Sequence, residues 1–222
     1  CQMFLIDIDA VEERDDADVP RYNIAPTQRV ACVLQLPGQN RIATALRWGL
    51  VPRWADDLAI GHRMINARGE TVDTKPSFRS AFAKRRCLIP TDGYYEWKKV
   101  ADGKQPYLIH RPDDGVMAMA GLWEENTKAS PDGSPIRTCT VITTDANAAT
   151  SKIHDRMPVL LDPSNFDPWL DPDNHEVDRL KSMLRPAPDD LLCCDAVSRR
   201  VNSPRNDDAS CIEAVPTDTL FD

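Results

Sequence analysis

Short apolar runs separated by turn residues recur along this chain about every 8 to 15 residues. Runs of this length are typical of strands, and only a few stretches carry helical spacing. Many short strands with a few helices predict an α+β fold, built on a curved, barrel-like, mainly antiparallel β-sheet with flanking helices. No repeat and no linker-like break in composition interrupts the pattern, so residues 1–222 are expected to form a single domain.

The expected elements follow from these runs. Strands are expected in the segments CQMFLIDI, VACVLQL, RIATALRW, RCLIP, YYEWKKV, QPYLIH, VMAMAGLW, RTCTVITT, PVLL and LLCCDAV. Helices are expected in the segments KPSFRSAF, DPWLDP and VDRLKSML, and a further helix is expected to start at Thr144 or Asp145. A loop that carries His154 should follow that last helix.

Charge is distributed unevenly along the chain. The formal net charge is −8, which argues against a nucleic-acid partner because phosphate contacts use Lys and Arg. The segment from Arg41 to Val100, however, holds 12 Lys and Arg against six Asp and Glu, a local charge of +6 that leaves −14 for the remainder. A basic middle segment of this kind can still bind a polyanion.

No stretch approaches the roughly 18 to 20 apolar residues of a membrane-spanning helix, and no signal-peptide pattern opens the sequence. A cytoplasmic protein without a membrane partner is therefore expected. The seven cysteines are scattered and odd in number, which fits neither a disulfide framework nor the ligand spacing of a zinc motif. We interpret them as reduced thiols, mostly small buried hydrophobic residues.

Cys1 is the exception, because a first-position cysteine carries an α-amine and a thiol on adjacent carbons. Roughly 10% of such an amine is neutral and nucleophilic at pH 7. It can form a Schiff base with an aldehyde, and the thiol can then close a five-membered thiazolidine ring. The alternatives are a cloning artefact, an ordinary residue exposed by removal of an initiator Met, and a lipoprotein cysteine, which fits poorly before a strand-like segment.

Two further segments carry polar side chains suited to catalysis. In INARGET, Asn66 and Arg68 share one face if the backbone is extended, and together they could fix a phosphate or a nucleophile. A turn with a surface salt bridge is the alternative. In YYEW, Glu96 lies between Tyr95 and Trp97, where desolvation would raise the pKa of its carboxyl group and favour general acid catalysis. The alternative places Glu96 on the solvent face of an edge strand.

The histidines differ in their surroundings. His154, in SKIHDRMP, is a candidate proton shuttle near neutral pH, although a lone histidine in such a loop is often structural. The other three lack comparable neighbours and are expected to be surface or packing residues: His62, His110 and His175.

The segment RWGLVPRW interleaves Trp48 and Trp54 with Arg47 and Arg53. Indole rings stack on unpaired bases, and arginines meet phosphates, so this segment favours binding of single-stranded nucleic acid. Packing of both indoles in the core is the alternative.

The order of these motifs and their amino-acid sequences resemble the SOS response-associated peptidase (SRAP) family of abasic-site processing proteins. The resemblance runs nearly from end to end. It rests on Cys1 and Phe4 and on the blocks RYNIAPTQ, WGLVPRWA, NARGETV, KPSFRSAF, RCLIPTDGYYEW, AGLWE and VITTDANAATSKIHDRMPVLL.

This resemblance implies a single α+β domain that binds single-stranded DNA and, in the DNA damage response, captures the ring-opened sugar aldehyde of an abasic site as a covalent crosslink. Cys1 would be the nucleophile and Asn66 would orient it. Glu96 would help to open the sugar ring, and His154 would move protons during Schiff-base formation and reversal.

The resemblance also implies a DNA groove lined by Arg68, Trp48 and Arg156. It implies no metal and no organic cofactor, the partner is single-stranded DNA with abasic sites, and we expect a monomer. The chain departs from the family pattern in CQMF where Cys-Gly-Arg-Phe is usual, in NARGET where NARSET is usual, and in YYEW where FYEW is usual. Replacement of the usual arginine by Met3 removes one expected phosphate contact.

Two other functions are consistent with the same residues. The first is a peptidase or amidase in which Cys1 is an N-terminal nucleophile and Asn66 stabilises an oxyanion, an activity that includes autoproteolytic removal of a preceding Met. The second is a noncovalent binding module for damaged DNA, for which Cys1 would be dispensable.

Overall fold

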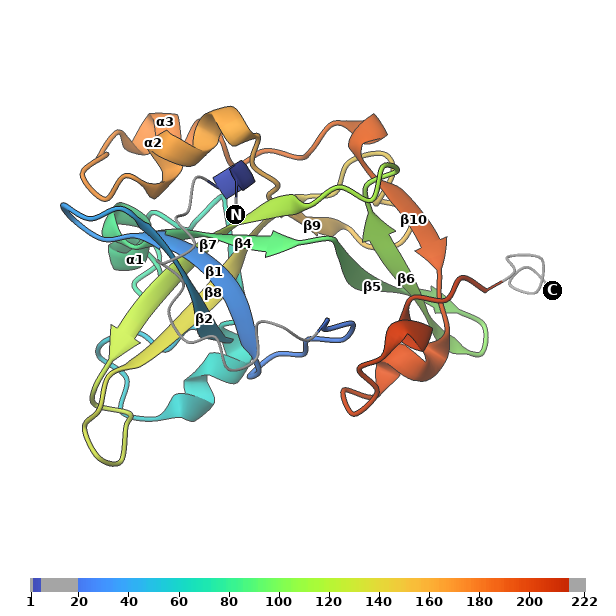
Figure 1. Cartoon of the computed structure of the whole chain (residues 1–222), viewed down its shortest axis with the longest axis horizontal. Helices are drawn as coiled ribbons and strands as arrows, with labels where there is room; N and C mark the ends of the chain where they lie inside the picture. Colours follow the sequence, from blue (N-terminus) through green and yellow to red (C-terminus); the bar gives the residue numbers. More distant parts are fainter. Residues whose placement is uncertain (1, 5–19, 216–222) are drawn as a thin grey trace.

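The computed structural model describes residues 2–4 and 20–215, and they form two β-sheets with short helices packed around the larger one (Figure 1). The strands are β1 (Arg29–Gln35), β2 (Arg41–Trp48), β3 (Asn66–Arg68), β4 (Arg86–Thr91), β5 (Gly93–Val100), β6 (Gly103–His110), β7 (Met117–Asn126), β8 (Ile136–Asp145), β9 (Arg156–Pro158) and β10 (Cys193–Ala196). The α-helices are α1 (Arg79–Lys84), α2 (Phe166–Leu170) and α3 (Val177–Ser182).

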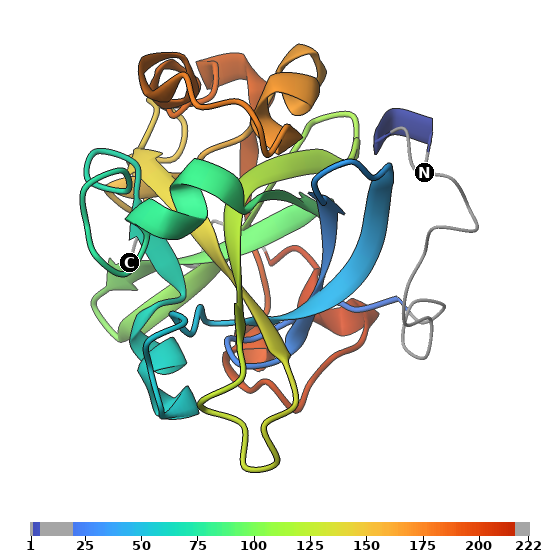
Figure 2. The same cartoon turned by 90° about the vertical axis from the view of Figure 1, so that its left-hand side faces the viewer.

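The larger sheet closes into a five-stranded barrel (Figure 2). Its strands follow the order β2-β1-β4-β7-β8 through antiparallel pairs, and β2 then pairs with β8 in parallel. The short strand β3 lies beside β8 in parallel, and β9 pairs with β8 in the antiparallel sense. The expected barrel-like, mainly antiparallel sheet with flanking helices is confirmed.

The barrel has a core on each side of its wall because side chains alternate along every strand. Inside, all five strands contribute small and aliphatic side chains, including Cys32, Cys87 and Cys139. Outside, Val33 and Leu88 belong to a second core that the three helices cover. Both faces of β7 and β8 are therefore buried along most of their length, including the threonines of β8.

Arg86 fixes the helices to the outer face of the barrel. Its side chain is 2% exposed, and it donates hydrogen bonds to the carbonyl oxygens of Phe82 (2.7 Å) and Trp169 (2.7 Å). A further carbonyl, that of Asp171, accepts from the same guanidinium group. Burial lowers the pKa of Arg86 to about 10, so the side chain is still charged at neutral pH. One buried cation thus satisfies carbonyl groups at the ends of two helices.

The smaller sheet has the order β10-β6-β5 and stands beside the barrel (Figure 1). Tyr94, Ile109 and Cys194 on one face pack toward the barrel and the loop that precedes β9. Tyr95 and Leu108 on the other face pack against the C-terminal segment that follows β10. This arrangement leaves β5 as an edge strand of the smaller sheet.

Two expected elements are corrected by the structure. Gln2–Phe4 form a turn of 3-10 helix rather than the start of a strand, and the rest of that expected strand lies outside the described residues. No helix begins at Thr144 or Asp145, because β8 runs through Asp145 and is followed by turns. There the Asn147 side chain accepts the backbone N–H of Thr150 (3.0 Å), and the turns that follow reach His154 without forming a helix.

The helices expected near α1, α2 and α3 are present, and so is the short strand expected at β10. Within the described ranges, no helix combines the length and the apolar character needed to cross a membrane.

Candidate functional site

Cys1, the predicted nucleophile, lies outside the described residues. The next predicted residues, Asn66 and Arg68, lie at the two ends of β3, which pairs with Val141–Thr143 of β8. Both side chains are exposed, whereas Ala67 between them is 0% exposed. The prediction that Asn66 and Arg68 share a face of an extended segment is confirmed.

Glu96 lies in the middle of β5, opposite Tyr107 of β6. Its side chain is half-buried, and burial raises the pKa of the carboxyl group. The charge of His154 lowers the pKa of Glu96, and the charge of Asp155 raises it. Burial outweighs the effects of these charges, so the carboxyl group of Glu96 is easier to protonate than that of an exposed glutamate. The effect of His154 on this pKa means that the two side chains lie within electrostatic range of each other.

His154 lies at the end of the turns between β8 and β9, and its side chain is 44% exposed. Its backbone N–H donates to the carbonyl oxygen of Thr150 (3.1 Å). Its ring atom Nδ1 accepts the backbone N–H of Arg156 (3.1 Å). The carboxylate of Asp155 lies 3.2 Å from the same nitrogen, so Nδ1 faces both a donor and an acceptor.

Arg156, predicted to line a DNA groove, holds the His154 loop in place. Its guanidinium group donates to both carboxylate oxygens of Glu70 (2.8 and 3.0 Å), to Asp145 (2.7 Å) and to the carbonyl oxygen of Thr143 (2.8 Å). The hydrogen bond from Arg156 lowers the pKa of Glu70. Since Glu70 follows Asn66 and Arg68 along the chain, this ion pair ties the loop of His154 to the segment of Asn66.

The four residues of RWGLVPRW divide into two pairs. Arg47 and Trp48 on β2 are partly buried and donate hydrogen bonds to the carbonyl oxygens of Thr27 (2.8 Å) and Ile65 (2.8 Å), respectively. Arg53 and Trp54, in the turn after β2, are exposed, and the Trp54 side chain is 56% exposed. Trp48 is thus held mainly by packing and by its hydrogen bond within the protein, while Trp54 presents its indole ring to solvent.

A shallow pocket of about 310 Å³ borders that exposed turn. Its lining residues are Pro52, Arg53, Trp54, Pro76, Ser77, Ser80, Glu124 and Lys128. Glu96 and His154 do not contribute to it, so the exposed indole and the pair Glu96 and His154 occupy separate places on the described surface.

The turn with Trp54 is held by β7 through residues that the sequence did not single out. Asn126, which is 1% exposed, donates through Nδ2 to the carbonyl oxygens of Pro52 (2.7 Å) and Ala55 (2.8 Å). Glu124 on the same strand accepts the backbone N–H of Arg53 (3.4 Å) and also pairs with Arg85. The sequence of β7 gave no indication of these contacts, because polar residues at the end of a strand usually face solvent.

Gly49 allows the same segment to turn sharply after β2. Its φ is +124°, a value that favours glycine, and a Cβ atom there would lie 2.7 Å from the carbonyl oxygen of Gly61. The close approach of these two backbones explains the glycine in RWGLVPRW.

Comparisons with known proteins agree with this geometry. A model of the family described as SOS response associated peptidase (SRAP) matches residues 3–204. Abasic site processing protein YoqW of Bacillus subtilis is 45% identical over 197 residues, which are 88% of this chain and 86% of the relative. Abasic site processing protein HMCES of Gallus gallus is 31% identical in an alignment of 225 positions, gaps included, which covers 87% of this chain and 66% of that relative.

A crystal structure of a protein from Bacteroides thetaiotaomicron matches the fold with a TM-score of 0.76 and 27% identity. The match covers 86% of this chain and 82% of the other. A phage-related protein from Bordetella bronchiseptica matches with a TM-score of 0.64 and 31% identity, over 80% and 82% of the two chains. Sequence and fold agree over most of the chain, which belongs to the SOS response-associated peptidase family.

Proposed function

We propose that this chain processes abasic sites in single-stranded DNA by forming a covalent crosslink between Cys1 and the ring-opened sugar. The observation that carries the proposal is the half-buried Glu96, whose pKa is raised by burial, close to an accessible His154. Its relatives YoqW and HMCES are named abasic site processing proteins. The proposal requires a free α-amine on Cys1.

The chemistry balances without a cofactor. The α-amine of Cys1 attacks the aldehyde carbon, and loss of one water leaves an imine. The thiol sulfur then adds to the imine carbon, while the thiol proton passes to the nitrogen. An aldehyde and an aminothiol thereby give a thiazolidine and one water, with no change in oxidation state.

Each described residue has a role in these steps. Protonated Glu96 donates to the sugar ring oxygen, which opens the closed sugar and exposes the aldehyde. His154, with its exposed ring, carries protons to and from the nitrogen during imine formation and reversal. Asn66, whose amide is exposed at the start of β3, holds the Cys1 amine in position.

Single-stranded DNA is the proposed partner, and the protein acts as a monomer. Arg68 and Arg53 meet the phosphates, and the exposed ring of Trp54 stacks on a base. The indole of Trp48 donates a hydrogen bond to the carbonyl oxygen of Ile65 and so supports the backbone just before β3, which carries Arg68. We place this activity in the cytoplasm, because the six described cysteines have free thiols, as expected in a reducing compartment.

We also propose that the chain is a lyase-like enzyme whose peptidase activity is confined to removal of the residue before Cys1. The description of its family as a peptidase favours this limited activity. Arginines and an exposed indole suit DNA better than a peptide substrate. A protein translated with Met before Cys1, in an extract without methionine aminopeptidase, should lose that Met by itself, and Glu96→Gln should slow the loss.

Blocking the terminus tests the crosslink. Acetylation of the Cys1 amine should abolish covalent capture of an abasic oligonucleotide, since an amide nitrogen cannot form a Schiff base and a thiol alone gives only a labile hemithioacetal. Cys1→Ser keeps the amine, so borohydride should still trap an imine, but the adduct should be less stable. Intact-protein mass spectrometry and denaturing gels measure both the amount of crosslink formed and its stability.

Unblocked protein is the matched control, and fluorescence anisotropy should show equal binding of DNA by all three forms. A heat-stable crosslink formed by the acetylated protein would overturn the thiazolidine and assign the attack to a lysine or another cysteine.

A further inference from the structure

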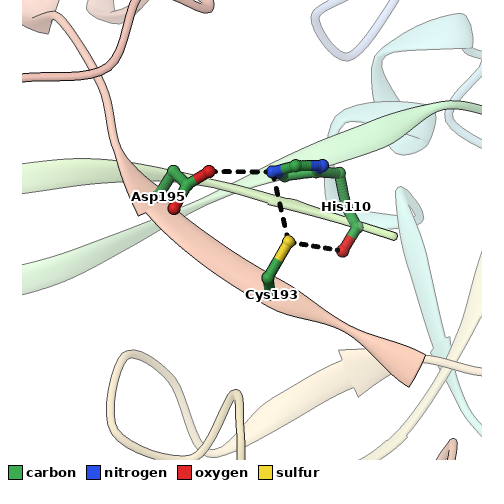
Figure 3. Close-up of side chains that lie close together, drawn as sticks. All are labelled: His110, Cys193 and Asp195. Atoms are coloured by element: carbon green, nitrogen blue, oxygen red, sulfur yellow. Dashed lines mark hydrogen bonds and ion pairs between the residues drawn. The ribbon is translucent and has the colours of Figure 1, made fainter. Parts of the chain in front are cut away.

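A second cluster of reactive side chains joins β6 to β10 (Figure 3). His110 ends β6, and Cys193 lies directly opposite it on β10, followed two residues later by Asp195. His110 Nε2 lies 3.3 Å from Cys193 Sγ and 3.0 Å from Asp195 Oδ2. The three atoms all lie within 4.8 Å of one another, the one such group of three or more His, Cys, Asp and Glu residues in the described ranges.

This cluster lies on the opposite face of the sheet from Glu96. In an antiparallel pair, residues directly opposite each other share a face, and faces alternate along a strand. His110 pairs with Gly93 on β5, three positions before Glu96, so their side chains emerge on opposite faces. The cluster is therefore separate from the residues proposed to act on DNA.

The hydrogen bonds of His110 define what its ring can bind. Ring atom Nδ1 lies 2.9 Å from the carbonyl oxygen of Arg111, which can only accept, so Nδ1 carries a proton. In the neutral ring, Nε2 then has a free lone pair. That lone pair faces Asp195, which as a carboxylate cannot donate to it, and Cys193, whose thiol can donate either to Nε2 or to the carbonyl oxygen of His110 (3.4 Å).

A cation held between these side chains would satisfy the Nε2 lone pair and the Asp195 carboxylate at the same time. A histidine that binds a metal through one nitrogen usually donates its other N–H to a backbone carbonyl or a carboxylate. His110 has this arrangement, since Asp114 also lies 3.5 Å from Nδ1.

We propose that His110, Cys193 and Asp195 form a binding site for Zn²⁺. One nitrogen, one sulfur and one oxygen ligand match the donors that zinc accepts, whereas Mg²⁺ and Ca²⁺ bind oxygen. In a tetrahedral zinc site these ligand atoms would lie about 3.4 to 3.6 Å apart, from the usual bond lengths. The observed 3.3 and 3.0 Å from Nε2 are slightly shorter than this, and the third pair, Cys193 Sγ and Asp195 Oδ, lies within 4.8 Å, so small side-chain rotations would bring the three atoms to the distances of a zinc site.

Three protein ligands leave the fourth position of the metal for water. Access is open, because the side chain of Asp195 is 56% exposed while that of His110 is 17% exposed. Binding replaces the thiol proton of Cys193 by the metal, and that proton passes to the buffer. The bound ion would join β6 to β10 and thereby hold the C-terminal segment on the smaller sheet.

Titration of the metal-free full chain with Co²⁺ alone tests the site. We expect one Co²⁺ per chain, with a thiolate-to-cobalt charge-transfer band and the visible bands of a tetrahedral ion, and Zn²⁺ should displace it. Cys1 can also bind metal as an aminothiol, so every titration is done in a Cys1→Ser background.

Cys193→Ser should remove the charge-transfer band. Its matched control is Cys194→Ser, whose thiol faces the other side of β10 near Ala149 and which should keep the band. Asp195→Asn changes only an exposed side chain, so this variant should fold, and it should weaken binding at least about tenfold, the size of effect that even outer-shell changes produce.

Absence of a band in the parent protein, or a band that survives in Cys193→Ser or disappears in Cys194→Ser, would overturn the site. The melting temperature provides a second measurement, because Zn²⁺ should raise it in the parent and much less in Asp195→Asn. Cys193→Ser with native Cys1 should still crosslink DNA, so failure of this site and failure of the proposed function are distinguishable.

Discussion

At the scale of single residues, the candidate site depends on a contrast between two ionisable side chains. Burial raises the pKa of Glu96, whereas Glu70 has its pKa lowered by the hydrogen bond from Arg156. The two carboxyl groups therefore differ in how readily they take up a proton. Glu96 is easier to protonate than an exposed glutamate, which suits the acid role proposed for it, and the ion pair of Glu70 with Arg156 favours the ionised form of Glu70.

Glu96→Gln tests the proton of Glu96 through the pH dependence of capture. Because the raised pKa keeps Glu96 protonated to higher pH than an exposed glutamate, its contribution should be largest at low pH and should fall as pH rises through that pKa. The variant should slow capture by roughly a hundredfold at low pH and keep its affinity for DNA.

Crosslinking rates measured over a pH series give the ratio of parent to variant. That ratio should approach one at high pH, where the parent carboxyl group is ionised. An identical ratio at every pH would remove Glu96 as the acid.

Arg156→Lys separates the positioning of His154 from contact with DNA. Lysine keeps the charge but cannot bind Glu70, Asp145 and the Thr143 carbonyl together, so the loop with His154 should lose its fixed geometry. We expect slower crosslinking with little change in DNA affinity.

The comparison variant is Arg68→Ala, which should weaken DNA binding more than it slows the chemical step. Anisotropy and single-turnover crosslinking measure the two effects separately. If Arg156→Lys instead reduced affinity and left the rate intact, Arg156 would be a phosphate contact.

At the scale of elements, β7 determines where the exposed indole lies. The turn from Pro52 to Ala55 has no strand partner of its own, and Asn126 holds both of its ends. Trp54 is therefore presented on a fixed platform, which lowers the entropy cost of stacking on a base.

Asn126→Ala should weaken binding of single-stranded DNA without touching the ligand. Loss of the amide leaves two carbonyl groups without their donor, at a cost of about 1 to 3 kcal/mol in the free energy of unfolding. Urea unfolding and anisotropy measure the two consequences. Trp54→Ala is the control, since it should weaken binding equally but leave stability nearly unchanged; unchanged binding in Asn126→Ala would show that the turn does not need its anchor.

Local signals in the sequence predicted many elements but not their partners. Apolar runs bounded by turns predicted the strands, and helical spacing predicted α1. The three-residue strand β3 forms through its pairing with β8, and no helix starts at Thr144 because β8 continues through Asp145, where it pairs with β9. Register between β6 and β10 brings His110 to Cys193, a pairing that no spacing in the sequence reveals.

The candidate site shows the same division. The aromatic residues that flank Glu96 in the sequence were enough to predict a raised pKa for its carboxyl group. The alternation of side chains along an extended backbone was enough to place Asn66 and Arg68 on one face. The bidentate contact of Arg156 with Glu70 could not be predicted, because it depends on how β9 and the segment after β3 lie across β8.

At the scale of the whole molecule, charge sets the conditions for binding. The chain carries a net charge of −8, while the segment from Arg41 to Val100 is locally basic. Phosphate contacts from that segment must therefore act against repulsion from the rest of the surface, which makes binding moderate and sensitive to salt.

We expect single strands to bind more tightly than intact duplex, whose stacked bases cannot reach Trp54. Anisotropy across a salt series should show affinity for single strands falling as salt rises. Equal affinity for both forms of DNA, or the absence of a salt dependence, would contradict the assignment of this surface to DNA.

The parallel contact that closes the barrel also affects how the chain reaches its native state. Hairpins such as β1 with β2 and β7 with β8 bring together residues close in sequence and can form early. The seam of Trp48 with Cys139 joins segments far apart in the chain, so its closure bears a large loop entropy and should come late. Until then β2 and β8 expose unpaired edges, which makes the partly folded chain, rather than the native protein, the species most prone to aggregate.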